Sequence, residues 1–360
     1  MHRSRSDGWR SLAPVLTGLA VLAVLGGTAP AGAQSIDSTV RDTLHSRNAP
    51  AEKLAGRVRV ALSASAVRMD AGFYDAYAVN AGFAPFLGEH LQVGISPTWR
   101  ALDDNVNPAF QTRGGSVAAR YIFGGDPHWR GFVGVFGGAW SANSNHSSQL
   151  GAQLGTLYFL TPALAIRAGI DLRRGAPYSA GQPRSTLVYV TLDPYAFGAA
   201  DDVAVAPAGF GTLDIAGSYV YERLARVSES GISGTIAPYL TRWAQIGASG
   251  EADGTSQEIR AHQLRGFGRI YLPLTVRTQP FAEGFAETST FNGEDGGLTS
   301  YGGEIGMRRM LNANVALDVG VQRTMHPREM LGSGNFTHPY REPGGTALVV
   351  AMMTRIGRAR

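Results

Sequence analysis

Histidine and serine are the side chains in this sequence that could support hydrolysis, provided that a carboxylate orients the histidine. They come together at His146, which precedes Ser147 and Ser148, while His326 and His338 lie near the C-terminus. The spacings H-x-x-x-H, H-E-x-x-H and G-x-S-x-G do not occur, and there is no phosphate-binding loop. The sequence therefore predicts no catalytic residue, no metal site and no cofactor.

A second group of residues places charge on one face of alternating segments. Over 163–173, Arg167, Asp171 and Arg173 share one face, and apolar side chains occupy the other. Charge is costly against lipid, so the charged face should point inward. We expect the following residues to line a lumen, with arginine–glutamate pairing among the last four: Arg167, Arg269, Glu283, Glu304 and Arg308. Charge neutralisation inside a barrel explains them, and a proton relay or substrate site is the alternative.

An alternating-strand framework must position these charges, and residues 57–356 read as such a framework, with eight segments in each half. Short connections are expected at 87–90, 124–129, 160–163, 240–243, 273–278 and 311–314. Longer polar ones are expected at 102–112, 174–184, 250–262 and 325–345. Membrane barrels have short periplasmic turns and longer extracellular loops. With the N-terminus in the periplasm, every short connection falls on that side, and both termini end there.

The chain also repeats itself. APFLGEHLQVGIS at 84–96 and APYLTRWAQIGAS at 237–249 are identical at six positions, and 150–170 aligns with 301–321 in the same way. Such a repeat indicates one β unit made twice. The sequence predicts a first eight-stranded repeat over 57–197 and a second over 198–360.

The N-terminus predicts a signal peptide over 1–33, followed by a polar periplasmic lead over 34–56. Three arginines precede an apolar run at 12–25, and small residues offer a cleavage site near Ala33. No other segment approaches the ~20 apolar residues of a membrane helix, whereas a membrane strand needs only ~9–11 residues. Cysteine is absent, so hydrogen bonding and packing must close the structure.

Composition limits the partners further. The net charge of +4 rests almost wholly on arginine, and no basic run with interleaved aromatics occurs, so we expect no nucleic-acid partner. Aromatic residues near the expected strand ends suit interfacial girdles: Tyr121, Trp129, Tyr158, Tyr239, Trp243 and Tyr271.

Each half resembles the eight-stranded outer-membrane β-barrel domain family, the OmpX/OmpW-like group. The segments with this resemblance are 84–96, 118–138 and 151–172, with counterparts at 237–249, 267–286 and 302–321. The resemblance implies a membrane-embedded barrel and no catalytic residue. The chain departs from the family in being doubled, and its end, VVAMMTRIGRAR, has no terminal aromatic residue for the barrel-assembly machinery.

Doubling leaves two architectures. The halves merge into one antiparallel transmembrane barrel of about 16 strands, or each closes into its own eight-stranded barrel. The mature length favours the single barrel, which we expect. Phe281 and Phe285, with counterparts Phe132 and Phe136, suit filled small barrels instead.

The expected protein is a non-enzymatic outer-membrane barrel of a Gram-negative-type bacterium, with a porin-like role in passive passage of small solutes or a structural role. Its partners would be outer-membrane lipid, the barrel-assembly machinery and small solutes. The alternative is a surface-binding or adhesion barrel that acts through 102–112, 250–262 and 325–345. A rim enzyme built on His146 or His326 is a third hypothesis.

Overall fold

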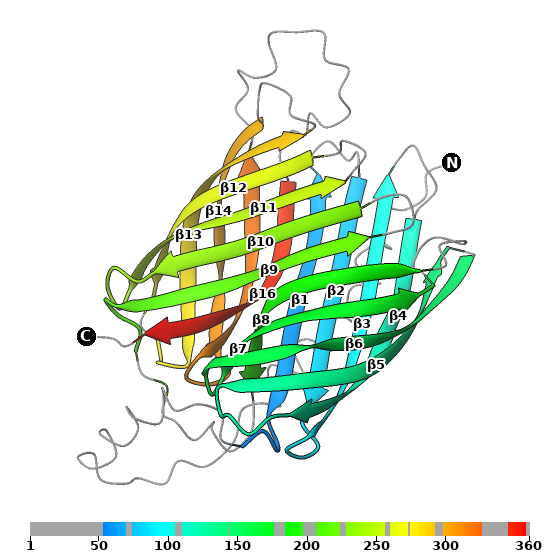
Figure 1. Ribbon diagram of the computed structural model, residues 1–360. Coiled ribbons are helices and arrows are strands. Elements are labelled where there is room, and N and C mark those ends of the chain that lie inside the picture. The colour runs from blue at the N-terminus through cyan, green and yellow to red at the C-terminus, as the bar shows by residue number, and fades with distance from the viewer. Residues whose placement is uncertain are drawn as a thin grey trace, which may run out of the picture. The chain divides into compact units, whose positions relative to one another are not determined.

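Alternating side chains fold into sixteen antiparallel strands that close into a barrel (Figure 1). They are β1 (Val58–Met69), β2 (Tyr74–Pro85), β3 (Leu91–Asp104), β4 (Phe110–Phe123), β5 (Trp129–Ala142), β6 (Asn145–Thr161), β7 (Leu164–Arg174), β8 (Ser185–Ala196), β9 (Thr212–Arg223), β10 (Ser228–Pro238), β11 (Ala244–Thr255), β12 (Arg260–Tyr271), β13 (Thr278–Phe291), β14 (Leu298–Met310), β15 (Val315–Met325) and β16 (Gly345–Gly357). Each strand pairs with its neighbours in the chain, and β1 pairs with β16. The predicted all-β antiparallel barrel of about 16 strands is confirmed.

The computed structural model describes residues 53–69, 74–104, 110–143, 145–175, 184–196, 205, 207–223, 228–255, 260–272, 274–291, 298–325 and 345–357. They all belong to the unit His45–Arg360. The predicted signal peptide, most of the polar lead and the C-terminal end of the chain lie outside the described residues. Within the described part, no helix is long and apolar enough to cross a membrane.

In each strand, the side chains of alternate residues face the inside and the outside of the barrel. In β12, Arg265, Arg269 and Tyr271 turn inward, whereas Leu264 and Ile270 are 59% and 62% exposed on the outside. Cross-strand partners lie on the same face of a sheet, so the register extends this assignment to every neighbouring strand. The inner face of the barrel is therefore polar and aromatic, and its outer face is apolar.

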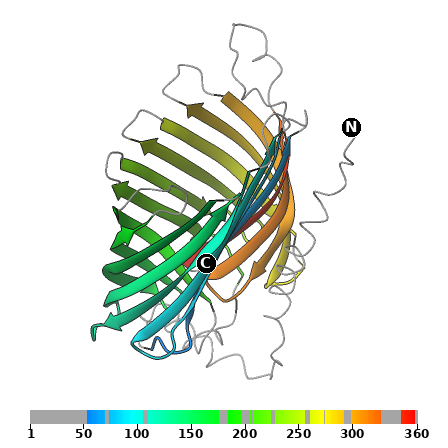
Figure 2. The ribbon, with the colours of Figure 1, turned by 90° about the vertical axis from the view of Figure 1, so that its right-hand side faces the viewer.

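The pairing of β1 changes along its length. Its second half, Ala64–Met69, pairs with β16, but Val58 and Arg59 pair with Ala196 and Tyr195 of β8. β2 and β3 continue the ring on the other edge of β1. Figure 2 shows β1 in blue beside β15 and β16 in orange and red on one wall.

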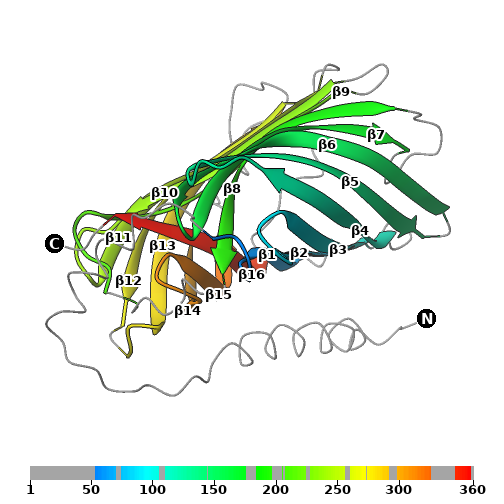
Figure 3. The same ribbon diagram turned by 60° about the horizontal axis from the view of Figure 1, so that its bottom comes forward.

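β9 changes partners in the same manner. Its second half pairs with β8 through Thr186–Thr191, whereas residues 212–215 pair with residues 354–357 of β16. The four strands β1, β8, β9 and β16 thus meet in the middle of the molecule (Figure 1). In Figure 3, strands β11–β15 gather on one side of them and β2–β7 on the other.

The barrel consequently has two different ends. At the end where β1 and β9 begin, two eight-stranded rings close, which we name lobe 1 (β1–β8) and lobe 2 (β9–β16). At the other end, named the wide half, β1–β16 and β8–β9 pairing joins all strands into one ring. The predicted single barrel therefore forms, and the additional β1–β8 and β9–β16 pairings divide only its lobe end into two eight-stranded rings.

The six predicted short connections all lie at the lobe end, because each joins the end of one strand to the start of its hairpin partner there. The long connections 174–184 and 325–345 agree with the strand bounds to within one residue, whereas those predicted at 102–112 and 250–262 are shorter. Pairing of β11 with β12 continues from Glu251 opposite Gln263 to Gly254 opposite Arg260, inside the predicted loop 250–262. Polar composition misplaced this boundary, because a strand continues as long as its backbone groups find partners.

Each lobe has its own buried cluster. Lobe 1 is filled by a cluster that comprises Leu54, Phe86, Ile122, Phe132, Leu157, Phe159, Ala165, Leu187, Tyr189 and Tyr195. Lobe 2 buries Ala208, Tyr239, Tyr271 and Phe281. Leu54 and Ala208 come from the segments just before β1 and β9, so each lobe is closed partly by the chain that leads into it.

Candidate functional site

The structure divides the five predicted lumen residues between the two lobes. Arg167 of β7 lies in lobe 1 and pairs with Asp193, with Nε 2.6 Å from Oδ2. Arg269, Glu283, Glu304 and Arg308 lie in lobe 2 on β12, β13 and β14. All five face inward, and Arg308 is 0% exposed.

The predicted arginine–glutamate pairing occurs for some of these residues. Arg269 Nη2 lies 2.7 Å from Glu283 Oε2, and Glu304 Oε2 lies 3.6 Å from Arg265 Nη2. Arg265 also bonds Glu283. Arg308 differs from the expectation, because its partners are two aspartates of other strands.

Arg308 is the centre of the lobe 2 network. Its Nε and Nη2 donate to the two oxygens of Asp318, each at 2.6 Å, in a bidentate pair. Its Nη1 donates to Asp214 and, at 2.6 Å, to the Tyr239 hydroxyl. Arg355 Nη2 donates to the same hydroxyl at 2.6 Å. The network therefore ties strands β9, β14, β15 and β16, and Tyr239 directly after β10, together across the lobe.

Charge in this network balances. The arginines are Arg265, Arg269, Arg308 and Arg355, and the carboxylates are Asp214, Glu283, Glu304 and Asp318. A buried charge is tolerated when it is paired and hydrogen-bonded. Lobe 2 satisfies this condition with its own residues.

Sequence reasoning missed several members of the network. Asp214 and Arg355 lie directly opposite each other where β9 and β16 pair, a contact between distant parts of the chain. Tyr239 and Tyr271 were predicted in an aromatic girdle, and this is wrong, since both are 1% exposed inside lobe 2. Tyr271 donates to Gln245 Oε1 at 2.8 Å. The sequence did contain a signal for this: Tyr239 and Tyr271 each lie an even number of residues from inward-facing residues of the same segment.

Other predicted girdle residues do lie on the outer surface. Tyr121, Trp129 and Tyr158 are 53%, 54% and 38% exposed, and Trp129 packs against Tyr158 with ring centroids 5.6 Å apart. Trp243 has Arg242 over its ring, at 4.6 Å from the centroid.

Charge on the outer face is confined to the strand ends. Among residues whose side chains the structure describes, the charged ones that face outward on strands are Arg113, Arg174, Arg223, Arg309 and Arg323, each within four residues of a strand end. Between them the outer face presents apolar side chains such as Ile95, Val117 and Leu154, all more than half exposed. A closed barrel with an apolar outside and a charged inside is the architecture of an outer-membrane barrel.

The mouth of lobe 1 is closed by a turn carboxylate and the chain before β1. Glu89 accepts hydrogen bonds from the N–H of Leu54 at 2.9 Å and of Ala55 at 3.3 Å. Leu54 is 1% exposed in the lobe 1 cluster. The N–H of Leu54 favours the ionised carboxylate and holds the pKa of Glu89 below its usual value, against an opposing effect of burial.

This contact predicts a pH dependence at the lobe 1 mouth. A lowered pKa in the folded state means that the contribution of Glu89 is present above its unfolded pKa and is lost as pH falls through the folded value. Protection of the Leu54 amide against hydrogen exchange, corrected for the intrinsic rate, should therefore fall below about pH 4. Glu89→Gln should show low protection at every pH. Unchanged protection in that variant would contradict the assignment.

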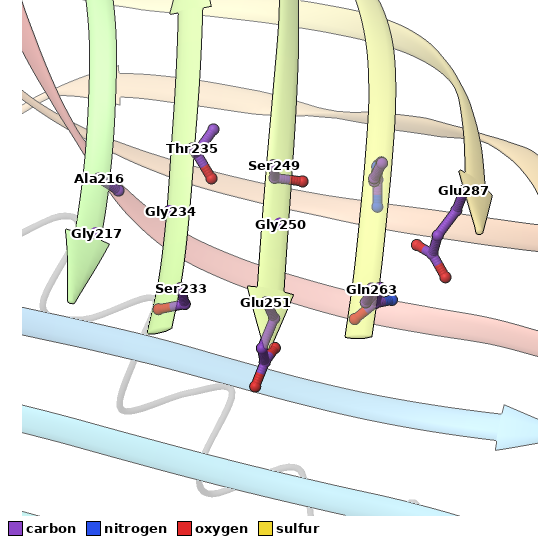
Figure 4. Close-up of a pocket in the computed structure, with 11 residues that line it drawn as sticks. Ala216, Gly217, Ser233, Gly234, Thr235, Ser249, Gly250, Glu251, Gln263 and Glu287 are labelled. Carbon is purple, nitrogen blue, oxygen red and sulfur yellow. The ribbon is translucent and has the colours of Figure 1, made fainter. Parts of the chain in front are cut away.

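Above lobe 2, the wide half contains a cavity of about 270 Å³ (Figure 4). Hydroxyl and charged side chains from β10–β13 line it, among them Ser233, Thr235, Ser249, Glu251, Arg265 and Glu287. Gly217, Gly234 and Gly250 contribute only backbone to its wall, because their positions alternate with those of the inward side chains. The cavity is polar and lies directly beside the Arg265–Glu283 pair.

The rim candidates are not assembled. His146 and Ser148 are exposed and share the outward face of β6, away from the lumen. His326 and His338 lie outside the described residues, as do the centres of the loops named for surface binding. In the part of the chain that the structure describes, no three histidine, aspartate or glutamate side chains gather in a manner that could hold a metal.

No family model and no curated protein match this chain. Similar solved structures include a bacterial polysaccharide outer membrane secretin, with 12% identity and a TM-score of 0.45, covering 85% of this chain and 99% of that one. CdiB from Acinetobacter baumannii has 10% identity and a TM-score of 0.43, covering 84% and 60%. The CymD monoaromatic hydrocarbon channel has 6% identity and a TM-score of 0.37, covering 85% and 89%. At scores this low, the likenesses support no inference about function, and the OmpX/OmpW-like resemblance stays a prediction.

Proposed function

We propose that this chain is a non-enzymatic outer-membrane barrel that admits small polar solutes into its wide half and passes them only slowly. The observation that supports this is the division of one sixteen-stranded ring into two eight-stranded rings. A barrel of 16 strands leaves an aqueous channel, whereas an eight-stranded interior is just wide enough for side chains to fill.

Both lobes are filled in the expected way. Phe132 and Phe159 in lobe 1 are 0% exposed, and Arg308 in lobe 2 is likewise 0% exposed. A solute that enters the wide half therefore meets an aromatic cluster on one side and an ion-pair network on the other. Passage requires side chains to move, which makes it slow and selective for small solutes.

The orientation follows from the connections. An even number of strands places the start of β1 and the end of β16 at the lobe end, where the short turns also lie. We propose that this end faces the periplasm and the wide half faces outward, with outer-membrane lipid around the apolar belt. Insertion by the barrel-assembly machinery belongs to the same proposal.

Conductance in a planar bilayer tests this function. The refolded protein should show openings far smaller than those of an open sixteen-stranded porin measured in the same bilayer, because its narrow ends are packed. Heat-modifiable migration and antiparallel β circular dichroism would establish that the sample is folded. A steady conductance equal to that of the porin would contradict the proposal.

A further inference from the structure

The two lobes place an arginine at the same position of their rings. Gln92 lies opposite Arg120 in the sheet as Gln245 lies opposite Arg269. Both glutamines donate through Nε2 to a carbonyl of the preceding hairpin strand, that of Ala84 at 3.2 Å and that of Ala237 at 3.0 Å. The register therefore provides a residue-by-residue comparison of the two interiors.

The neighbours of these two arginines differ in charge. In lobe 2, the positions that follow Arg269 around the ring hold Glu283 and Glu304, and in lobe 1 the same positions hold Gly134 and Gln153. The position of Asp318 in lobe 2 is taken by Arg167 in lobe 1. At these three positions lobe 1 has no carboxylate and one additional arginine, whereas Leu157 takes the position of Arg308 and Asp171 takes that of Gln322.

Arg120 is consequently buried among neutral partners. It is 8% exposed, and its Nε and Nη1 donate to the side-chain oxygens of Gln153 at 2.8 Å and Gln92 at 2.9 Å. No carboxylate in the described part of the chain pairs with it. Arg59 and Arg167 repel it electrostatically and Asp193 attracts it, but Asp193 forms its ion pairs with Arg59 and Arg167.

The charges of this interior do not balance. Among the residues that the structure describes, Arg59, Arg120 and Arg167 share a single carboxylate, Asp193, because the other one, Asp171, pairs with Arg173 at 3.3 Å. Buried cations without a counter-charge are strongly unfavourable. The counter-charge that lobe 2 builds from glutamate and aspartate must come to lobe 1 from elsewhere.

Unused hydrogen-bond donors lie on the same inward face. Arg59 Nε, Gln153 Nε2 and the Tyr189 hydroxyl are buried without a partner among the described residues. Gln153 and Tyr189 are 3% and 4% exposed, and the free Nε2 belongs to the amide that accepts from Arg120. Among the described residues of lobe 1, the acceptor without a partner is Asp171 Oδ1, which lies opposite Gln153 in the sheet and belongs to the carboxylate that Arg173 neutralises. Buried donors normally have acceptors, and an anion is an acceptor for all of these donors.

We propose that lobe 1 binds a small inorganic anion between Arg120 and Gln153, with Arg59 and Tyr189 as further donors. Chloride is the probe that we choose for it. The anion replaces the carboxylates that lobe 2 carries at the matching positions. The site does not depend on passage of solutes through the barrel, so its test and the conductance test are independent.

Thermal unfolding in an uncharged detergent tests the site. The wild-type melting temperature should be about 3 °C higher in chloride than in gluconate at equal ionic strength, because a ligand that binds only the folded state stabilises it. Gln153→Glu should abolish this difference, since its carboxylate stands where Glu304 stands in lobe 2. Gln322→Glu is the matched control: Gln322 also faces inward and accepts from an arginine, Arg265, at 2.7 Å, but in lobe 2. It should retain the chloride effect.

Two further results decide the location. Arg120→Gln should also lose the chloride effect, which keeps the proposal testable if Gln153→Glu does not fold. In crystals grown with bromide, the anomalous signal should lie within hydrogen-bond distance of Arg120 in the wild type and be absent from Gln153→Glu. A wild type with equal melting temperatures in both salts would overturn the proposal. A chloride effect that survives in both lobe 1 variants would overturn it as well.

Discussion

Paired cysteines at positions 58 and 196 should form a disulfide in the folded barrel, and so should paired cysteines at positions 65 and 349. Val58 lies opposite Ala196 within lobe 1, and Ser65 lies opposite Val349 in the wide half. Opposed residues in antiparallel strands have Cα atoms about 4.5–5.5 Å apart, which a disulfide can span. The protein has no cysteine of its own, so each engineered pair reports one contact. Migration on non-reducing gels measures the yield.

Two control pairs distinguish this architecture from its simpler alternatives. Continuing the β1–β16 register to the start of β1 would place Val58 opposite Ile356, but Ile356 pairs with Leu213. Val58→Cys with Ile356→Cys should therefore remain reduced, whereas an undivided barrel would oxidise it.

The second control extends the β1–β8 register in the opposite direction. It would place Ser65 opposite Tyr189, but Tyr189 pairs with Val220. Ser65→Cys with Tyr189→Cys would cross-link in two separate barrels and should not do so here. Efficient oxidation of either control pair, with failure of the pair that competes with it, would refute the divided barrel.

Arg308→Met should destabilise the barrel by about 3–5 kcal/mol, the usual cost of removing one partner from a buried ion pair. The substitution leaves Asp214 with Arg355, at 3.3 Å, and Asp318 with Arg269, at 2.6 Å, as their remaining arginine partners. The Tyr239 hydroxyl also loses one of its donors. Urea titration of the heat-modifiable form in lipid or detergent measures the free energy of unfolding.

The next residue along β14 provides the matched control. Arg309 faces outward and donates to the Thr278 hydroxyl, and Arg309→Met should change stability by no more than about 0.5 kcal/mol. Adding Asp318→Asn to Arg308→Met should restore part of the loss, because it removes one of the carboxylates left short of charge. Equal effects of Arg308→Met and Arg309→Met would contradict the role given to the network.

The sequence alone determined the strands and the direction of most of their charges. Parity in a strand is local, so the contrast of Arg269 with Leu264, or of Arg167 with its apolar neighbours, was sufficient to place these arginines inside. Where residue class was used instead of parity, the prediction failed: Tyr239 and Tyr271 are aromatic and near strand ends, yet they are buried in lobe 2. The lengths of the connections likewise predicted that the six short turns lie together at one end of the barrel.

Only the tertiary structure decided which strands close the rings. The alternation of β1 is the same whether its partner is β8, β16 or both in turn, because side-chain parity does not depend on the neighbour. The choice rests on pairings between residues far apart in the chain, such as Val58 with Ala196 and Ala64 with Val350. For the same reason, the sequence could not match Arg308 with Asp214, or show that Arg120 lacks the carboxylates that surround Arg269. These contacts depend on register across closed rings, which no local pattern specifies.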